Sequence, residues 1–464
     1  MKKVLGYNIL FLLFSCQAFA LAPSAPTDIS QKLSIPVEKY TLDNGLTMLL
    51  AEDHSEPFVA VNIWYFVGSI NEKPRKTGWA HLFEHLMFEG SKYVPGSEHF
   101  RILEKIGGFD VNATTGFERT NYYETVPKSQ LPLILAMESS RMFFLNITKE
   151  KLDEQRAVVR REREQRVETA PYGVATLKLW QSIFLENHPF HGRVIGSHND
   201  LEAASLRDVQ NFYDFFYGPS NAAIALVGDF DKAEALSLIN KYFGSLPRTR
   251  VEPVPLLPKV DLGQQEIIVV DEKLGKLPLV RMQYVTPALF QPGDAELDVI
   301  SHILTGGEFG RLTKAITRDK QMASSTSAYQ QSHQQLSIFT IDTIVNPGID
   351  PRNVIIEIDR VLADLVKNAP TSTEIERAKN SILTTQFFSL QSLGGQSGRA
   401  ELLQTYNRFA DDPNFIQQDI GRYKKITQES LLLSATRYLP VGKSRKILIA
   451  TPAASGVALK TKRK

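Results

Sequence analysis

The residues best suited to metal chemistry lie between Gly78 and Gly90, where two histidines are four residues apart. In a helix, this spacing places the imidazoles of His81 and His85 on one face, so both can bind the same ion. Glu84 lies on nearly the same face and can hold a water molecule beside the ion without being a ligand. The residues between them are mostly apolar, which predicts a buried helix whose polar groups need a partner such as a divalent cation. Two ordinary core or capping histidines are the alternative.

A catalytic zinc site needs a third protein ligand and leaves one position for water. The candidate is Glu162, in a predicted helix that runs from Lys149 to about residue 165. Gln155, Val158, Val159 and Glu162 share one face of that helix. The two valines mark this face as inward, which would turn Glu162 into the core. Taken alone, a glutamate in such an arginine-rich segment is more often a surface residue.

The order of predicted elements favours an α+β fold. Strands and helices alternate without the regular rhythm of a doubly wound sheet, so each domain is expected to be a mostly antiparallel β-sheet packed with helices. A hairpin is predicted at Asp43–Gly45 and a long strand at Phe58–Val67, which leads into the histidine helix. Residues 247–258 contain four prolines and no helical or strand period. This segment is therefore predicted to be a linker.

Beyond the linker the same order of elements restarts, which predicts a duplicated domain. When residues 80–90 are aligned with residues 297–307, the second copy keeps the apolar positions but lacks the metal-binding motif. Asp298, Ser301 and His302 then stand opposite His81, Glu84 and His85. The predicted organisation is a signal peptide over residues 1–20, a catalytic domain over 30–246, a linker over 247–260, a degenerate repeat over 261–452 and a basic tail over 453–464.

The N-terminus has the pattern of a secretory signal. A charged start at residues 1–3, an apolar run at Val4–Phe14 and the small residues of Ala18–Ala20 predict export, with a periplasmic location expected. The single cysteine, Cys16, would be removed with the signal, leaving neither disulfides nor a cysteine-ligated metal. Lipid anchoring at Cys16 is the less favoured alternative, because Phe14 is bulky for a lipoprotein cleavage site. No later stretch is long and apolar enough to span a bilayer.

The composition is that of an ordinary globular protein. The 464 residues are 43% hydrophobic and 22% charged, and the formal net charge is +2. A charge this small argues against nucleic acid or an anionic membrane as a partner.

The motif His81-x-x-Glu84-His85, with Glu162 placed 77 residues after His85, resembles the pitrilysin/insulinase family of zinc metallopeptidases, whose H-x-x-E-H signature defines the inverzincins. Other segments carry the same resemblance through most of the first half. They are residues 107–115 with 120–122, residues 171–173, residues 217–222 and residues 227–230.

The resemblance implies that His81, His85 and Glu162 bind one zinc ion and that Glu84 activates the attacking water. It also implies that substrate peptides lie extended beside an edge strand, here the residues Asn112, Ala113 and Thr114. The implied activity is that of a metalloendopeptidase acting on peptides or small unfolded proteins. The predicted substrate preference is loose, because this mode contacts mainly the peptide backbone.

Two positions depart from the family pattern. Gln155 stands where the family usually has a glutamate that supports the site, so the outer contact would be an amide without charge. In the second half the family carries an arginine and a tyrosine that stabilise the oxyanion. Arg318 fits the arginine and is a candidate substrate-binding residue. A serine stands where the tyrosine belongs, and the nearest tyrosine is Tyr329.

Complete enzymes of the family enclose substrate between two halves, and this chain supplies one. The economical hypothesis is a heterodimer with a homologous two-domain subunit that carries the arginine and tyrosine. A homodimer that uses Ser324 or Tyr329 is the alternative. Two other function classes stay open, namely a catalytically silent scaffold or binding subunit, and a metal-binding or processing chaperone without peptidase activity.

Overall fold

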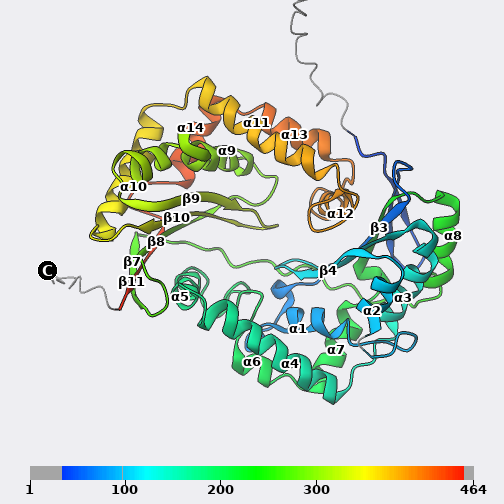
Figure 1. The fold of residues 1–464 in the computed structure, drawn as a ribbon. Coiled ribbons are helices and arrows are strands. Elements are labelled where there is room, and N and C mark those ends of the chain that lie inside the picture. Colours follow the sequence, from blue (N-terminus) through cyan, green and yellow to red (C-terminus); the bar gives the residue numbers. More distant parts are fainter. Residues whose placement is uncertain (1–33, 97, 454–464) are drawn as a thin grey trace, which may run out of the picture. The chain divides into compact units, whose positions relative to one another are not determined.

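The computed structural model describes residues 34–96 and 98–453. The predicted signal peptide, Cys16 and residues 454–464 of the predicted basic tail lie outside this part of the chain. None of the helices in the described ranges is long and apolar enough to cross a membrane. The fold contains two mostly antiparallel sheets, each packed with helices (Figure 1). This confirms the predicted α+β class.

The first sheet has six strands in the order β1-β2-β6-β3-β5-β4, and only β2 and β6 run parallel. Strand β4 lies at the edge, where an extended peptide can be added to a sheet. The strands are β1 (Glu38–Thr41), β2 (Thr47–Glu52), β3 (Phe58–Tyr65), β4 (Phe109–Thr115), β5 (Thr120–Pro127) and β6 (Ala222–Gly228).

The second sheet has five strands in the order β7-β11-β8-β10-β9, and only β7 and β11 run parallel. Taken in this order, the five strands correspond one to one to β2, β6, β3, β5 and β4 of the first sheet. Neighbouring strands run in the same relative directions in the two sheets. Helix α9 (Asp294–Thr305) follows β8 as α1 (Trp79–Leu86) follows β3. The matching topology confirms the predicted duplication. The strands are β7 (Glu266–Glu272), β8 (Leu279–Thr286), β9 (Ala323–Gln331), β10 (Ser337–Val345) and β11 (Lys446–Pro452).

Helices pack on these sheets and enclose two main apolar cores. In the first core, Val61 and Ile63 of β3 belong to the same buried cluster as Leu82 and Phe83 of α1. The other helices of the first half are α2 (Glu98–Lys105), α3 (Leu131–Phe143), α4 (Lys149–Arg163), α5 (Gly173–Ile183), α6 (His198–Glu202), α7 (Leu206–Phe216) and α8 (Lys232–Phe243). Those of the second half are α10 (Pro351–Lys367), α11 (Ser372–Ser389), α12 (Arg399–Phe409), α13 (Ile416–Lys424) and α14 (Gln428–Tyr438).

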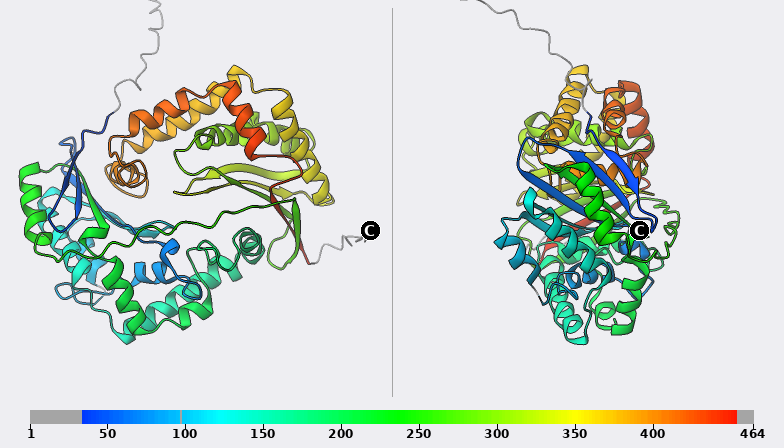
Figure 2. Two further views of the ribbon diagram at one scale, coloured as in Figure 1. Left: turned by 180° about the vertical axis from the view of Figure 1, so that it is seen from behind. Right: turned by 90° about the vertical axis from the view of Figure 1, so that its right-hand side faces the viewer.

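The two halves exchange one helix each. Helix α12 of the second half lies against the first sheet, where Gln404 Nε2 donates to the carbonyl oxygens of Asn62 (2.9 Å) and Ala223 (2.8 Å). Helix α5 of the first half packs on the second sheet, since Leu179 shares an apolar cluster with Leu448 of β11. The positions of α12 and α5 against these sheets can be followed in the ribbon views (Figures 1 and 2). Each sheet is therefore covered partly by the other half of the chain.

A buried carboxylate fixes α12 to the first sheet. Glu401 accepts hydrogen bonds from Asn62 Nδ2 (2.9 Å), Trp64 Nε1 (2.9 Å) and Asn121 Nδ2 (2.7 Å). The guanidinium of Arg119 lies 3.4 Å away. Because these donors have little access to water, their bonds depend on this one side chain.

Replacing Glu401 tests this attachment. We expect Glu401→Ala to lower the free energy of unfolding by about 3–5 kcal/mol, because it strands several buried donors. Urea denaturation measures the change. Glu104→Ala, at an exposed position on α2, is the matched control and should change stability by less than about 0.5 kcal/mol. Equal effects of the two variants would contradict the proposed role of Glu401.

Candidate metal centre

The helix that carries both histidines begins after a glycine in the left-handed region, Gly78, with φ of 85°. A Cβ at this position would lie 2.8 Å from the carbonyl oxygen of Ile195, so both the dihedral angle and the close approach require glycine. The carboxylate of Glu72 accepts from the N–H groups of Gly78 (3.0 Å) and Ala80 (2.8 Å). These are donors that the start of a helix leaves unsatisfied. The loop before α1 thus fixes where the helix begins.

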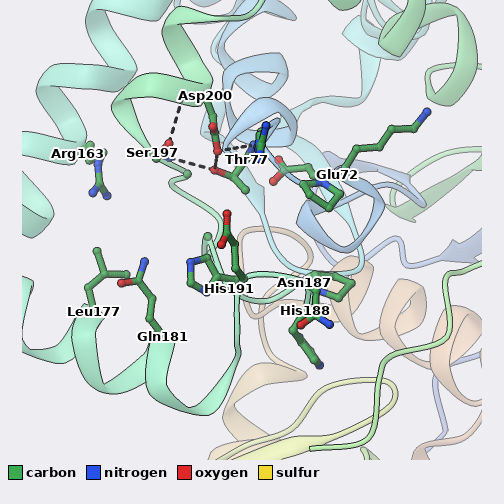
Figure 3. Close-up of a pocket in the computed structure, with 17 residues that line it drawn as sticks. Glu72, Thr77, Arg163, Leu177, Gln181, Asn187, His188, His191, Ser197 and Asp200 are labelled. Carbon is green, nitrogen blue, oxygen red and sulfur yellow. Dashed lines mark hydrogen bonds between the residues drawn. The ribbon is translucent and has the colours of Figure 1, made fainter. Parts of the chain in front are cut away.

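The loop before α1 borders a small cavity of about 240 Å³, and hydrogen bonds between residues that line this cavity hold the loop (Figure 3). Thr77 donates its backbone N–H to Asp200 Oδ2 (3.2 Å), and Ser197 donates its backbone N–H to Thr77 Oγ1 (3.2 Å). Ser197 Oγ in turn accepts from the N–H of Asp200 at the start of α6 (3.1 Å). The hydrogen bonds tie the loop before α1 to α6.

Helix α4 brings the distant carboxylate to the two imidazoles. Glu162 Oε2 lies 3.5 Å from His81 Nε2 and 3.4 Å from His85 Nε2. The two rings have their centroids 4.9 Å apart. The side chains of His81, His85 and Glu162 are 8%, 22% and 16% exposed. The structure therefore brings together the three predicted metal ligands, with their side chains largely buried.

The spacing of these atoms fits a zinc ion. Ligand bonds of about 2.0–2.1 Å in a tetrahedron place donor atoms about 3.4 Å apart. The charge states of His81 and Glu162 also fit, because metal ligands must be deprotonated. Burial, with the nearby His85, lowers the pKa of His81 to about 4, which keeps this imidazole neutral. Burial works against ionisation of Glu162, but the hydrogen bond with His85 and the positive charge of Arg166 outweigh it and lower the pKa of Glu162.

Neighbouring polar groups orient two of the three ligands. Gln155 Oε1 lies 3.2 Å from His85 Nδ1, and Gln155 Nε2 donates to Glu89 Oε1 (2.6 Å). Because the amide oxygen can only accept, His85 carries a proton on Nδ1, so Nε2, which faces Glu162, is the ring nitrogen that would bind a metal. Arg166 Nη1 lies 2.8 Å from the other oxygen of Glu162. The predicted supporting role of Gln155 is thus consistent with its contact.

Glu84 lies beside the three ligands but outside their cluster. Its Oε2 accepts a hydrogen bond from Thr115 Oγ1 at the end of β4. Burial raises the pKa of Glu84, although the bond from Thr115 and the charge of His85 oppose that rise. A carboxylate with a raised pKa holds a proton more readily, which suits a group that must accept a proton and return it.

All four groups open into a cavity of about 820 Å³ that is also lined by the predicted edge-strand residues Asn112, Ala113 and Thr114. The backbone groups of Thr114 are already occupied, because its N–H donates to Asn121 Oδ1 (3.0 Å) and its carbonyl accepts from Arg119 Nη1 (2.8 Å). The N–H of Ala113 donates to Asn112 Oδ1 (2.9 Å). The N–H groups of Ala113 and Thr114 are therefore already paired within the chain, which differs from their predicted role in hydrogen bonding to a peptide backbone.

The residues predicted from the second half are not brought to the ligands. Arg318 is half exposed, with its Nε donating to Asp319 (2.9 Å), and it is not among the described residues that line the cavity. Ser324 and Tyr329 are absent from that lining as well. The hydroxyl of Tyr329 donates to Asp342 Oδ2 (3.3 Å). No oxyanion donor from these three positions reaches the centre.

Three residues that line the cavity were not predicted from the sequence, namely Thr115, Arg166 and Arg193. Arg166 follows Glu162 by four residues, a spacing at which opposite charges pair on a helix, so the pattern could have indicated it. Thr115 ends the predicted edge strand, but nothing local indicates that it meets Glu84. Arg193 lies in a loop whose path has no sequence signature.

Comparisons with known proteins agree with this geometry. Residues 47–191 match the family model "Insulinase (Peptidase family M16)", and residues 203–382 match "Peptidase M16 inactive domain". The chain belongs to the insulinase family. The second match covers much of the half in which the histidine motif is lost.

Similar proteins carry related names. "Zinc protease PqqE" of Helicobacter pylori is 28% identical over 345 residues, which are 74% of this chain and 77% of the relative. "Uncharacterized zinc protease YmxG" of Bacillus subtilis is 23% identical, covering 81% of this chain and 90% of the relative. A crystal structure of a protease from Helicobacter pylori superposes with a TM-score of 0.83 at 25% identity, over 90% of this chain and 100% of that one.

A longer protein has the same fold. The periplasmic protease PqqL of Escherichia coli superposes with a TM-score of 0.74 at 19% identity. The match covers 89% of this chain but only 47% of that chain. This family member thus corresponds to about half of PqqL.

Gln155→Leu tests the support of the metal ligands. We expect the dissociation constant for zinc to rise about 10- to 100-fold, because His85 loses the acceptor that sets its tautomer and orientation. Competition with a chromogenic chelator measures this constant. Gln210→Leu, at an exposed position on α7, is the control and should leave zinc binding unchanged. Unchanged affinity in Gln155→Leu would show that the contact does not tune the centre.

Proposed function

We propose that this family member is a zinc-dependent metalloendopeptidase that hydrolyses peptides or small unfolded proteins. The observation that carries the proposal is the convergence of His81, His85 and Glu162, with Glu84 beside them, in one cavity bounded by an edge strand. The names of the relatives as zinc proteases support the choice of metal and reaction.

The chain's own groups suit peptide hydrolysis. His81, His85 and Glu162 would hold zinc, which supplies the Lewis acidity that makes water nucleophilic near neutral pH and polarises a peptide carbonyl. Glu84 takes the proton of the attacking water and then delivers it to the leaving amine. Thr115 holds the Glu84 carboxylate in place while the proton moves. The edge of β4 borders the same cavity, so an extended peptide in the cavity would lie beside these groups.

A partner subunit is part of this proposal. Arg318 and Tyr329 are engaged with Asp319 and Asp342, so oxyanion stabilisation is best supplied by a second, homologous two-domain subunit. The match to about half of PqqL supports an enzyme built from two such units. A homodimer that uses Ser324 or Tyr329 is the alternative. Robust hydrolysis by the purified chain, unaffected by a co-expressed homologue, would contradict the heterodimer.

The proposed location is outside the cytoplasm. It rests on the sequence of residues 1–20, which lie outside the described residues. Export through this segment, with cleavage near Ala20, is favoured over lipid attachment at Cys16.

Glu84→Gln tests the proposed reaction. We expect near-normal zinc content and a loss of peptide hydrolysis of about 10²- to 10⁴-fold, because the amide cannot accept the proton. Metal analysis and a quenched fluorescent peptide measure the two properties, with Glu154→Gln on the exposed side of α4 as the control. Bound zinc without hydrolysis in the unaltered protein would favour a silent scaffold or a chaperone. Hydrolysis that persists in Glu84→Gln would exclude Glu84 as the base.

A further inference from the structure

Arg193 lies in the loop between α5 and α6 and lines the same cavity as the three metal ligands. Its φ of 52° falls in the left-handed region, which a residue with a side chain rarely adopts. Such strain persists only where the surrounding structure enforces it, and it is common at functional sites. Val194 and Ile195, which follow it, line the cavity as well.

The neighbouring arginines are paired with carboxylates, but Arg193 is not. Arg166 pairs with Glu162 (2.8 Å), and Arg281 donates to both oxygens of Asp342 (2.6 and 2.7 Å). Within residues 34–96 and 98–453, the side chain of Arg193 has no hydrogen bond or ion pair. Its positive charge is therefore uncompensated on the cavity wall.

An aromatic surface holds the guanidinium of Arg193. Its Cζ lies 5.0 Å from the ring centroid of Trp180 on α5, a cation–π distance. Trp180 stacks on Phe117, with centroids 5.7 Å apart, and Phe117 also lines the cavity. Burial, together with the charge of Arg281, lowers the pKa of Arg193 without removing its positive charge. A cation held in such surroundings attracts an anion more strongly than one in open solvent.

The large cavity adjoins a second one that reaches the second half of the chain. This second cavity, of about 350 Å³, shares Arg166 with the large one. Ser325 and Ser327 of β9 line its far side. A peptide that lies along β4 therefore has room for a side chain or a chain end on this side of the metal ligands.

We propose that Arg193 forms a carboxylate-binding subsite that selects peptides carrying a carboxylate close to the bond to be cleaved. The planar guanidinium presents paired donors that match a carboxylate, and no carboxylate of the described chain uses them. The ligand group is an acidic side chain or the free C-terminus of the peptide. A role in substrate selection rests on the proposed peptidase function, but the binding preference itself can be measured without cleavage.

The test measures binding in the Glu84→Gln protein, which retains the centre but is expected not to cleave. The first probes are pairs of fluorescent peptides with an amidated C-terminus. The two peptides of a pair differ only in carrying a glutamate or a glutamine at one position, and this position changes from pair to pair. A further probe is the glutamine peptide with a free C-terminus. We expect that, at one position, the glutamate peptide binds about tenfold more tightly than its glutamine counterpart, as measured by fluorescence anisotropy. This preference should disappear when Arg193→Gln is added to the Glu84→Gln protein.

Two further variants keep this test decisive. Arg193→Lys keeps the positive charge but loses the paired donors, so the preference should persist but be weaker than with arginine. Arg352→Gln, at an exposed position on α10, is the control and should leave it unchanged. The glutamate and free C-terminus probes identify which carboxylate is bound.

Two results overturn the subsite. One is equal binding of all probes, and the other is a preference that persists in Arg193→Gln. The proposed peptidase function fails separately, if the unaltered protein binds the probes with this preference but cleaves none of them.

Discussion

The meeting of Glu162 with two imidazoles is the interaction on which the rest of the site depends. It joins α4 to α1 across 77 residues of chain, with the carboxylate 3.4 and 3.5 Å from the two Nε2 atoms. Without a cation, this arrangement gathers several polar groups where water is scarce, which is costly. A zinc ion would stabilise the folded protein by binding these groups, because electrostatic contacts are stronger in a buried site than in water.

The surroundings serve to hold those groups still. The loop before α1 is fixed by Glu72 and by hydrogen bonds to α6, and Gln155 sets the orientation of His85. Strand β4 contributes Thr115 to the carboxylate of Glu84. Such preorganisation is what distinguishes a reactive centre from a mere cluster of ionisable residues.

Periodicity predicted the local parts of this structure well. The spacing of His81 and His85 placed them on one helix face, and the inward valines of α4 correctly predicted that Glu162 turns inward, since Val159 is fully buried. The duplication followed from the repeated order of elements. The exchange of α5 and α12 could not be predicted, because an amphipathic pattern shows that a face is covered but not by which segment. The position of Arg193 depends on the path of a loop, which carries no periodic signal.

The exchanged helices have a consequence for the order of folding. The last strand of the first sheet ends at Gly228, but the helix that covers the face carrying Trp64 begins only at Arg399. The first half therefore cannot complete its own surface until a segment far along the chain has docked on it. A first half that folds earlier, or that is separated from the second, leaves Trp64 and its neighbours open to unwanted association with other polypeptides.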